Sequence, residues 1–366
     1  MVKIRDVDAP LPTVLVAGLG DLGGRVLDAL SRRPGLGRLV GASRDAERGR
    51  ALAGQCALVA ELAGGPRTVS FEPLDLTAHD DAAETLARVA PDVIVMAASA
   101  YTWWRPGAPA GLPYAVWLPL LVPLVAALMR ARAAAGVAAP VVSLPFPDVV
   151  GPMLATQGLA PQAGAGNVAE VAAKLAACAV ARTGAAREEV QVRLVLHHAA
   201  ERSALGVFER MGSGVDGRPP WAAEVLVRGE PLAAGDVEAL FAVPYPTLDG
   251  RDAQGLTAAA AVAVVEGLLG DVPVTGHVPA PAGRPGGYPV RLSRGGIELD
   301  LPASLPEADA IALNARAASW DGVQGIEADG TVVLTERAAE AARAAFGVEL
   351  GRMAPGELEA LAERLR

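Results

Sequence analysis

The sequence predicts an α/β protein in which a doubly wound parallel sheet of the Rossmann type precedes a second, α+β domain. A glycine-rich turn follows the first apolar strand at residues 18–23, and strands and helices then alternate to about residue 145. Further along, strands are separated by glycine-rich loops instead. The length of 366 residues also favours more than one domain.

The first part of the chain alternates between apolar strands and amphipathic helices. Strands are expected from residue 13 to the glycines and at 37–43, 68–73, 92–98 and 140–144. Helices are expected at 22–30, 46–62, 80–89 and over the apolar stretch that ends near 135. Five strands joined by helices imply a parallel sheet, so we assign residues 1–145 to a dinucleotide-binding domain.

The remaining chain mixes strands, helices and loops. A helix at 168–182, strands at 189–201 and 222–232 and a helix at 256–269 predict an α+β substrate and dimerisation domain at residues 146–285. Hairpins turning at 294–296 and 329–330, then helices at 336–346 and 355–366, predict a C-terminal segment, residues 286–366, that packs back on both domains.

Composition excludes several classes of protein. The net charge of −9 and the lack of any long Lys or Arg run argue against a nucleic-acid or anionic-membrane partner. Cys56 and Cys178 are the only cysteines, which supports neither a disulfide framework nor a thiolate zinc site and fits the cytoplasm. No secretory signal is evident, and the apolar stretch 114–129, interrupted by Pro119 and Pro123, is expected to be a buried helix.

The cofactor signal is a G-x-G-x-x-G motif between a strand and a helix. Gly18 permits the tight turn, Gly20 lets the backbone approach a diphosphate, and Gly23 allows close packing of helix on strand. Asp21 and Leu22 open the helix, whose N-terminus faces the phosphate charge.

The end of the second strand selects the dinucleotide. An NAD site uses an Asp or Glu there, whereas this strand ends in Ser43 and Arg44, which suit the 2′-phosphate of NADP(H). NADP(H) is therefore favoured over NAD(H), with Asp45 as the alternative ribose ligand. Asp75 and the pair Ala98-Ser99 follow the third and fourth strands, where ligands of such sheets bind, although Asp75 also suits a turn or helix cap.

Two families of nicotinamide enzymes are excluded by their residue requirements. A short-chain dehydrogenase needs Tyr-x-x-x-Lys, and no tyrosine of this chain has a lysine four residues later. Zinc-dependent alcohol chemistry needs Cys and His ligands that are absent at useful spacings, so no metal is expected.

The segment 158–167, GLAPQAGAGN, resembles the Gly-(Leu/Phe)-Asp-Pro-Gly junction of saccharopine dehydrogenase-like and carboxynorspermidine dehydrogenase-like reductases. The resemblance covers roughly the first half of the chain, and the chain departs from the pattern at Ala160 and at 162–163. It implies NADP(H)-dependent hydride transfer at a carbon–nitrogen bond of an amino-acid-derived substrate, and an α+β domain that forms a homodimer.

Candidate substrate residues follow the junction. Asn167 suits either substrate contact or, with Glu170, a capping box for the next helix. Lys174 lies on nearly the same helix face and is a candidate proton donor or carboxylate ligand, against the default of a solvated lysine.

Adjacent histidines on the expected strand 189–201 should point to opposite faces. His198 shares its face with Val190, Val192, Leu194 and Leu196 and is expected in the core or at a sheet edge. His197 is the expected site residue, with Arg193 beside it to grip a carboxylate.

Aromatic and basic residues supply the remaining candidates. Tyr101, past the fourth strand, is placed to touch a substrate over the nicotinamide, although Trp103 and Trp104 favour an aromatic wall or dimer contact. Arg284 and Tyr288, around a glycine-rich loop, are expected to close over a carboxylated substrate, unless the loop is only a linker.

These observations predict an NADP(H)-dependent oxidoreductase that acts on the C=N group of a small carboxylated metabolite, with His197, Lys174 or Tyr101 in the catalytic machinery. An aldehyde or keto reductase of the homoserine dehydrogenase type is one alternative. The other is a non-catalytic NADP(H) sensor, which would bind the cofactor without titratable groups in the adjoining pocket. The substrate and the direction of reaction are not set by the sequence.

Overall fold

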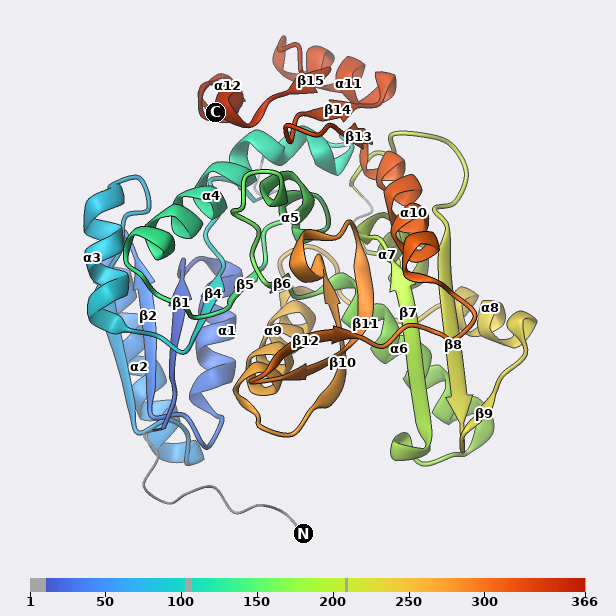
Figure 1. The fold of residues 1–366 in the computed structure, drawn as a ribbon, viewed down its shortest axis with the longest axis horizontal. Coiled ribbons are helices and arrows are strands. Elements are labelled where there is room, and N and C mark those ends of the chain that lie inside the picture. The colour runs from blue at the N-terminus through green and yellow to red at the C-terminus, as the bar shows by residue number, and fades with distance from the viewer. Residues whose placement is uncertain (1–10, 103–106, 208–209, 366) are drawn as a thin grey trace.

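A six-stranded parallel sheet organises the first half of the chain in the computed structural model, which describes residues 11–102, 107–207 and 210–365 (Figure 1). The strands lie in the order β3-β2-β1-β4-β5-β6. Their bounds are β1 (Thr13–Ala17), β2 (Arg38–Ser43), β3 (Thr68–Pro73), β4 (Val93–Met96), β5 (Val141–Ser143) and β6 (Ala163–Gly164). The order reverses between β1 and β4, which creates a crevice at the carboxyl ends of these two strands.

Helices cover both faces of this sheet, as a doubly wound fold requires (Figure 1). They are α1 (Asp21–Ser31), α2 (Ala46–Ala63), α3 (His79–Val89) and α4 (Leu118–Ala134), the last preceded by a 3₁₀ turn, η1 (Tyr114–Trp117). The predicted fold class is confirmed, and each strand predicted in this half is present.

The apolar helix passes through both prolines and ends at Ala134, close to the expected end near residue 135. Pro119 lies in its first turn and Pro123 inside it, and the helical stretch Tyr114–Ala134 is the one span among the described residues long and apolar enough to cross a membrane. However, 78% of its apolar window is buried. It is a core helix of the fold.

Two elements that the sequence analysis did not predict lie between β5 and residue 167. The helix α5 (Pro147–Ala155) follows β5, and β6 then adds a sixth parallel strand beside it. Pro147 stands in the first turn of α5, where its missing N–H costs nothing.

The second sheet is largely antiparallel, with the order β10-β11-β7-β8-β9 and β12 paired to β11. Its strands are β7 (Val190–Leu196), β8 (Trp221–Val227), β9 (Glu230–Pro231), β10 (Val274–Pro279), β11 (Gly287–Ser293) and β12 (Gly296–Leu299). The associated helices are α6 (Asn167–Thr183), α7 (His198–Leu205), α8 (Ala234–Ala242) and α9 (Gln254–Leu269), with 3₁₀ turns η2 (Arg187–Glu189) and η3 (Pro281–Gly283). β10 and α8 were not predicted.

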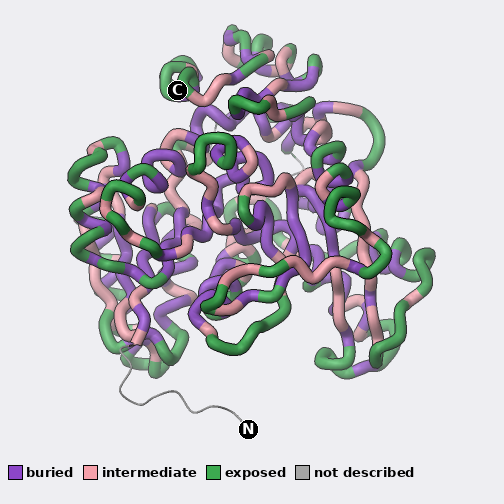
Figure 2. Tube along the Cα trace, in the orientation of Figure 1, coloured by how far each residue is buried: buried purple, intermediate pink, exposed green. Residues whose placement is uncertain are grey.

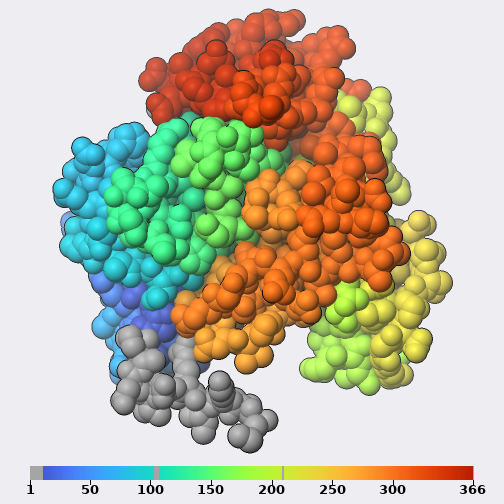
Figure 3. All heavy atoms as spheres, in the orientation of Figure 1, coloured from blue at the N-terminus to red at the C-terminus, as the bar shows by residue number. Residues whose placement is uncertain are grey.

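The helix α10 (Glu307–Ala317) packs on β7 and β8 of the second sheet, and the chain after it forms a small cap over α4 and its neighbours (Figures 1 and 3). The cap comprises η4 (Ala318–Asp321), β13 (Val323–Ile326), β14 (Val332–Leu334), α11 (Glu336–Phe346), β15 (Arg352–Met353), η5 (Pro355–Glu357) and α12 (Leu358–Leu365). The ring of Phe346 meets that of Trp117 edge-on at 5.5 Å, and α12 lies along α4. The cap therefore covers the apolar face of this helix.

Three apolar cores hold these layers together, and buried chain runs through the centre of the molecule (Figure 2). One core lies between the parallel sheet, α4 and the cap, and another lies behind α6 and β7. The remaining core joins Val14 and Val26 of the first domain to Val262 and Tyr288 of the second. Because α9 contacts α1 directly, the two domains share apolar surface and enclose a common cleft.

Candidate active site

The glycine turn lies at the crevice between β1 and β4. Gly18 has φ +97°, and a Cβ there would stand 2.4 Å from the backbone nitrogen of Ala98. A Cβ on Gly23 would stand 1.7 Å from the carbonyl oxygen of Gly18. Both positions are therefore closed to any side chain, and they hold α1 tightly against the turn.

Gly20 differs from the other two glycines. Its backbone is extended, with φ −71° and ψ −158°, and a Cβ there would meet no atom within 4 Å. The space in front of Gly20 is the cavity itself, and α1 begins at the next residue. The backbone amides in the first turn of this 11-residue helix, facing an open cradle, fit a diphosphate group.

A cavity of about 440 Å³ runs from this turn along the carboxyl ends of the strands. Of the ten residues predicted to bind the cofactor, Gly23 is packed behind the turn. The other nine line the cavity: Gly18, Gly20, Asp21, Leu22, Ser43, Arg44, Asp75, Ala98 and Ser99.

Two arginines line the cavity at the end of β2. Arg44 and Arg48 lie there together with Ser43. Asp45 also lines the cavity, but its carboxylate accepts a 3.0 Å hydrogen bond from the backbone of Arg48 and caps α2. The carboxylate of Asp45, which could hold a ribose hydroxyl, is thus engaged in capping, and two arginines lie beside it.

Asp75 combines the two roles considered for it. It lines the cavity, and its Oδ1 accepts hydrogen bonds from the backbone and hydroxyl of Thr77, at 2.9 and 2.7 Å, in a turn. These two bonds lower the pKa of the carboxyl.

The paired histidines exchange the roles expected for them. β7 ends at Leu196, His197 caps the N-terminus of α7 and His198 is its first residue. His197 is 0% exposed and does not line the cavity, whereas His198 does. The prediction of alternating faces was wrong because the strand stops before both residues. The run HAAERSAL, rich in helix formers, carried the signal for a helix here.

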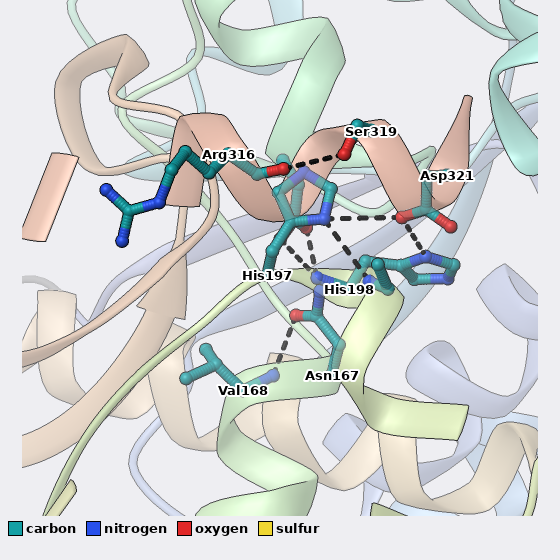
Figure 4. A network of polar contacts seen from close by, with 9 residues as sticks. Asn167, Val168, His197, His198, Arg316, Ser319 and Asp321 are labelled. Carbon is teal, nitrogen blue, oxygen red and sulfur yellow. Dashed lines mark hydrogen bonds and ion pairs between the residues drawn. The ribbon is translucent and has the colours of Figure 1, made fainter. Parts of the chain in front are cut away.

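Asp321 holds both imidazoles from the C-terminal cap (Figure 4). Its Oδ2 lies 2.8 Å from Nδ1 of His198 and 3.3 Å from Nδ1 of His197. Burial alone would raise the pKa of Asp321, but the two histidines lower it. Burial would lower the pKa of His198, yet Asp321, Asp148 and Glu170 raise it overall. This pair can therefore hold a proton near neutral pH and release it to a ligand in the cavity.

Asp148 fixes the backbone around this pair. Its Oδ1 accepts a 2.9 Å hydrogen bond from the backbone N–H of His198, and its Oδ2 accepts a 2.7 Å hydrogen bond from Nδ2 of Asn167. Asn167 lines the cavity, as expected of a substrate residue. The predicted capping box is absent, because α6 already includes Asn167 and Gly166 takes the cap position.

Two glutamates face the cavity beside His198. Glu170 accepts a 2.8 Å hydrogen bond from the hydroxyl of Thr257, and Glu201, which is 3% exposed, lines the cavity with it. Burial raises the pKa of both carboxyls, and the charge of Glu170 raises that of Glu201 further. Two neighbouring carboxyl groups of this kind favour sharing one proton.

Aromatic rings complete this end of the cavity. Tyr101, Tyr114 and Phe146 line it, and Tyr101 stacks on Trp117 at 4.2 Å. Phe146 has φ +42°, a costly backbone for a bulky residue, and its ring lies 5.2 Å from that of His198. Trp103 and Trp104 lie outside the described residues.

Four other predicted residues do not line the cavity. Lys174 is buried in α6 and donates to the carbonyls of Ala204 and Phe241, at the ends of α7 and α8. Burial lowers its pKa.

Arg193, Tyr288 and Arg284 also have partners within the protein. Arg193 pairs with Glu224 and Asp300 at 2.6 and 3.1 Å on the second sheet, so its fork is taken by the protein's own carboxylates. Tyr288 is 0% exposed, and Arg284 pairs with Glu307 at 2.7 Å. The prediction that Arg193, Arg284 and Tyr288 bind a substrate carboxylate in the cavity is therefore wrong.

Sequence reasoning missed Asp148, Glu201, Asp321, Tyr114 and Phe146. Asp321 arrives from more than 120 residues beyond His198, and no local pattern marks such a pairing. Asp148 carried a weak local signal, since it follows a buried strand at the sheet edge where ligands bind.

Similar proteins are found among solved structures. No model of a known protein family matches the sequence, and no curated protein matches it. Three similar structures are the following dehydrogenases. A lactate dehydrogenase from Eimeria maxima with NADH and oxamate has a TM-score of 0.59 and 13% identity, over 86% of this chain and 93% of that one. A lactate dehydrogenase from a Medee basin deep-sea metagenome library has a TM-score of 0.57 and 14% identity, over 84% and 96%. Cryptosporidium parvum malate dehydrogenase has a TM-score of 0.56 and 14% identity, over 84% of this chain and 96% of that one.

At these identities the likeness establishes the fold, a nucleotide-binding domain followed by a second domain, over most of both chains. None of the three is a saccharopine or carboxynorspermidine dehydrogenase, so the narrower resemblance of segment 158–167 gains no support from them.

Proposed function

We propose that the protein is an NADP(H)-dependent oxidoreductase that transfers hydride to or from a C=O or C=N group of a small metabolite. The observation that carries the proposal is one continuous cavity that joins the glycine turn at Gly20 to His198. A dinucleotide bound along the strand ends would supply the hydride. His198 would exchange the proton, and Asp321 would orient it.

The position of Asp321 supports this role of His198. Because Asp321 holds Nδ1, the proton exchanged with substrate is the one on Nε2. On reduction, imidazolium gives this proton to the developing oxyanion or amine; on oxidation, neutral imidazole takes it back. Asp148 holds the backbone N–H of His198 and so limits movement of the ring.

The basic residues at the end of β2 support NADP(H). Ser43, Arg44 and Arg48 surround the place where a 2′-phosphate would lie, and Asp45 is committed to its helix cap. The lactate dehydrogenases from Eimeria maxima and Cryptosporidium parvum are complexes with NADH and with nicotinamide adenine dinucleotide, so NAD(H) is the alternative cofactor.

The alternatives in chemistry differ in their support. The neighbours named as lactate and malate dehydrogenases favour C=O over C=N chemistry, in the manner of an aldehyde or keto reductase. A sensor without catalysis is disfavoured, because His198, Glu170 and Glu201 line the same cavity as the glycine turn.

Fluorescence titration with NADPH and NADH tests the cofactor assignment. We expect NADPH to bind more tightly than NADH. Arg44→Glu should abolish this preference by weakening NADPH binding about tenfold or more, as expected for loss of a charge-assisted hydrogen bond. Equal affinities that the substitution leaves unchanged would remove Arg44 from the site.

Turnover assays test the catalytic assignment. With semialdehydes set against pairs of keto acid and amine, His198→Gln should keep NADPH affinity and lose roughly 100-fold or more in turnover. The matched variant His197→Gln tests the residue favoured by the sequence. If His197→Gln abolished turnover while His198→Gln did not, the assignment would be reversed.

A further inference from the structure

The charged residues that line the cavity differ between its two ends. Arg44 and Arg48 are the only arginines among the described residues lining it, and both lie at the end of β2, where Asp45 and Asp75 stand beside them. At the other end, around His198, the charged lining residues within the described ranges are Glu170 and Glu201. A small substrate beside His198 therefore meets acidic side chains.

The carboxyl groups behind this lining increase the acidity. Asp321 is shared by two histidines, and Asp148 accepts from two N–H donors that carry no formal charge, the backbone of His198 and the amide of Asn167. The mutual repulsion of the Glu170 and Glu201 carboxyls favours one shared proton, which leaves one negative charge on the pair. A carboxylate on the substrate at this place would be repelled.

The aromatic lining gives a second, independent indication. Tyr101, Tyr114 and Phe146 border the same end of the cavity. Aromatic faces attract ammonium groups but not carboxylates, because the face of the ring carries the negative part of its quadrupole. Rings together with a carboxylate are the usual surroundings of a bound amine.

We infer that the substrate carries a protonated amine next to the carbon that exchanges hydride, and that the Glu170–Glu201 pair receives this amine beside the rings of Tyr114 and Phe146. The substrate class is an amino alcohol and its amino ketone, without a carboxylate at the reacting end. The inference rests on the proposed function. In the reduction, the carbonyl carbon gains hydride, its oxygen gains the proton of His198, and the ammonium group is unchanged.

Three probes of one carbon skeleton test the charge preference. These are 1-amino-2-propanol, 1,2-propanediol and lactate, each titrated calorimetrically into the full-length protein saturated with NADP⁺, with NADPH formation followed in parallel. We expect the amino alcohol to bind about tenfold or more tightly than the diol, and lactate to bind more weakly than the diol.

Two variants separate charge from shape. Glu201→Gln keeps one negative charge on Glu170 and should keep the preference for the amine. The double variant Glu170→Gln/Glu201→Gln removes the charge with nearly the same shape, so the preference should fall about tenfold. Glu298→Gln on the exposed strand β12 is a control for net charge and should change nothing.

The outcomes distinguish this inference from the proposed function. Failure of the wild-type protein to bind NADP⁺ or NADPH would refute the proposed function. Dinucleotide binding with lactate bound as tightly as the amine, with none of the three probes bound, or with the preference intact in the double variant would overturn the inference alone.

Discussion

Gly20 provides a substitution that should separate folding from cofactor binding. A Cβ at Gly20 meets no atom within 4 Å, and its φ of −71° suits any residue. Gly20→Val should therefore fold, at a cost below about 1 kcal/mol for a weaker helix cap. Its methyl groups would stand in the cavity and displace a phosphate from the amides at the start of α1.

The size of the effect follows from the bonds displaced. A hydrogen bond to a charged group contributes about 1.5–3 kcal/mol, so loss of one should weaken NADPH binding roughly 10- to 100-fold. By contrast, Gly23→Ala would place a Cβ 1.7 Å from the oxygen of Gly18, about half an ordinary contact distance of ~3.5–4.0 Å. It should destabilise the fold by about 1–3 kcal/mol or more.

The assay pairs NADPH fluorescence titration with thermal unfolding of the same samples. Gly54→Val is the matched control, because its Cβ also meets open space but lies on α2 outside the cavity lining. It should keep NADPH affinity. The reasoning would be refuted if Gly20→Val bound NADPH as tightly as the wild type, or if it unfolded as readily as Gly23→Ala.

Three further predictions concern titratable groups. Because the pKa of His198 is raised, the rate of reduction should fall as pH rises through a value above the ordinary histidine pKa. Asp321→Asn should move this fall in the pH–rate profile to lower pH, and an unchanged profile would contradict the pairing. Lys174→Met leaves two buried carbonyls without their donor, so chemical denaturation should show a free energy of unfolding lower by about 2–4 kcal/mol, with NADPH affinity intact. Lost turnover at full stability would instead restore Lys174 as a catalytic candidate. Because the pKa values of Glu170 and Glu201 are raised, the folded state holds a proton that the unfolded state releases. Stability, measured as melting temperature, should therefore fall as pH rises above the ordinary glutamate pKa, and Glu201→Gln should flatten this fall. Equal slopes for both proteins would exclude the shared proton.

Local patterns were sufficient to predict most of the first domain, but not α5 and β6. The period of the apolar residues and the glycine turn located β1 to β5 and the helices between them, because each βα unit buries its own face. The need for glycine at position 23 also follows from local geometry, because its Cβ would meet the carbonyl oxygen of Gly18 in the same turn. The need at position 18 depends in addition on Ala98, which is distant in sequence.

The catalytic end was beyond local reasoning. His198 was misassigned because period-two alternation was extended past Leu196, where the chain turns into a helix. Asp321 reaches His198 only through the packing of the cap, and Glu201 reaches the cavity only because α7 places it there. Arg193 and Lys174 looked available for a ligand because their partners, Glu224 and Phe241, lie 31 and 67 residues away in sequence.

A crystal structure of the protein with NADPH would test the central claim most directly. We predict the diphosphate on the amides at the start of α1, the 2′-phosphate beside Arg44, and the nicotinamide ring against His198. A glycine turn left empty at millimolar NADPH, or a nicotinamide ring directed away from His198, would contradict the account.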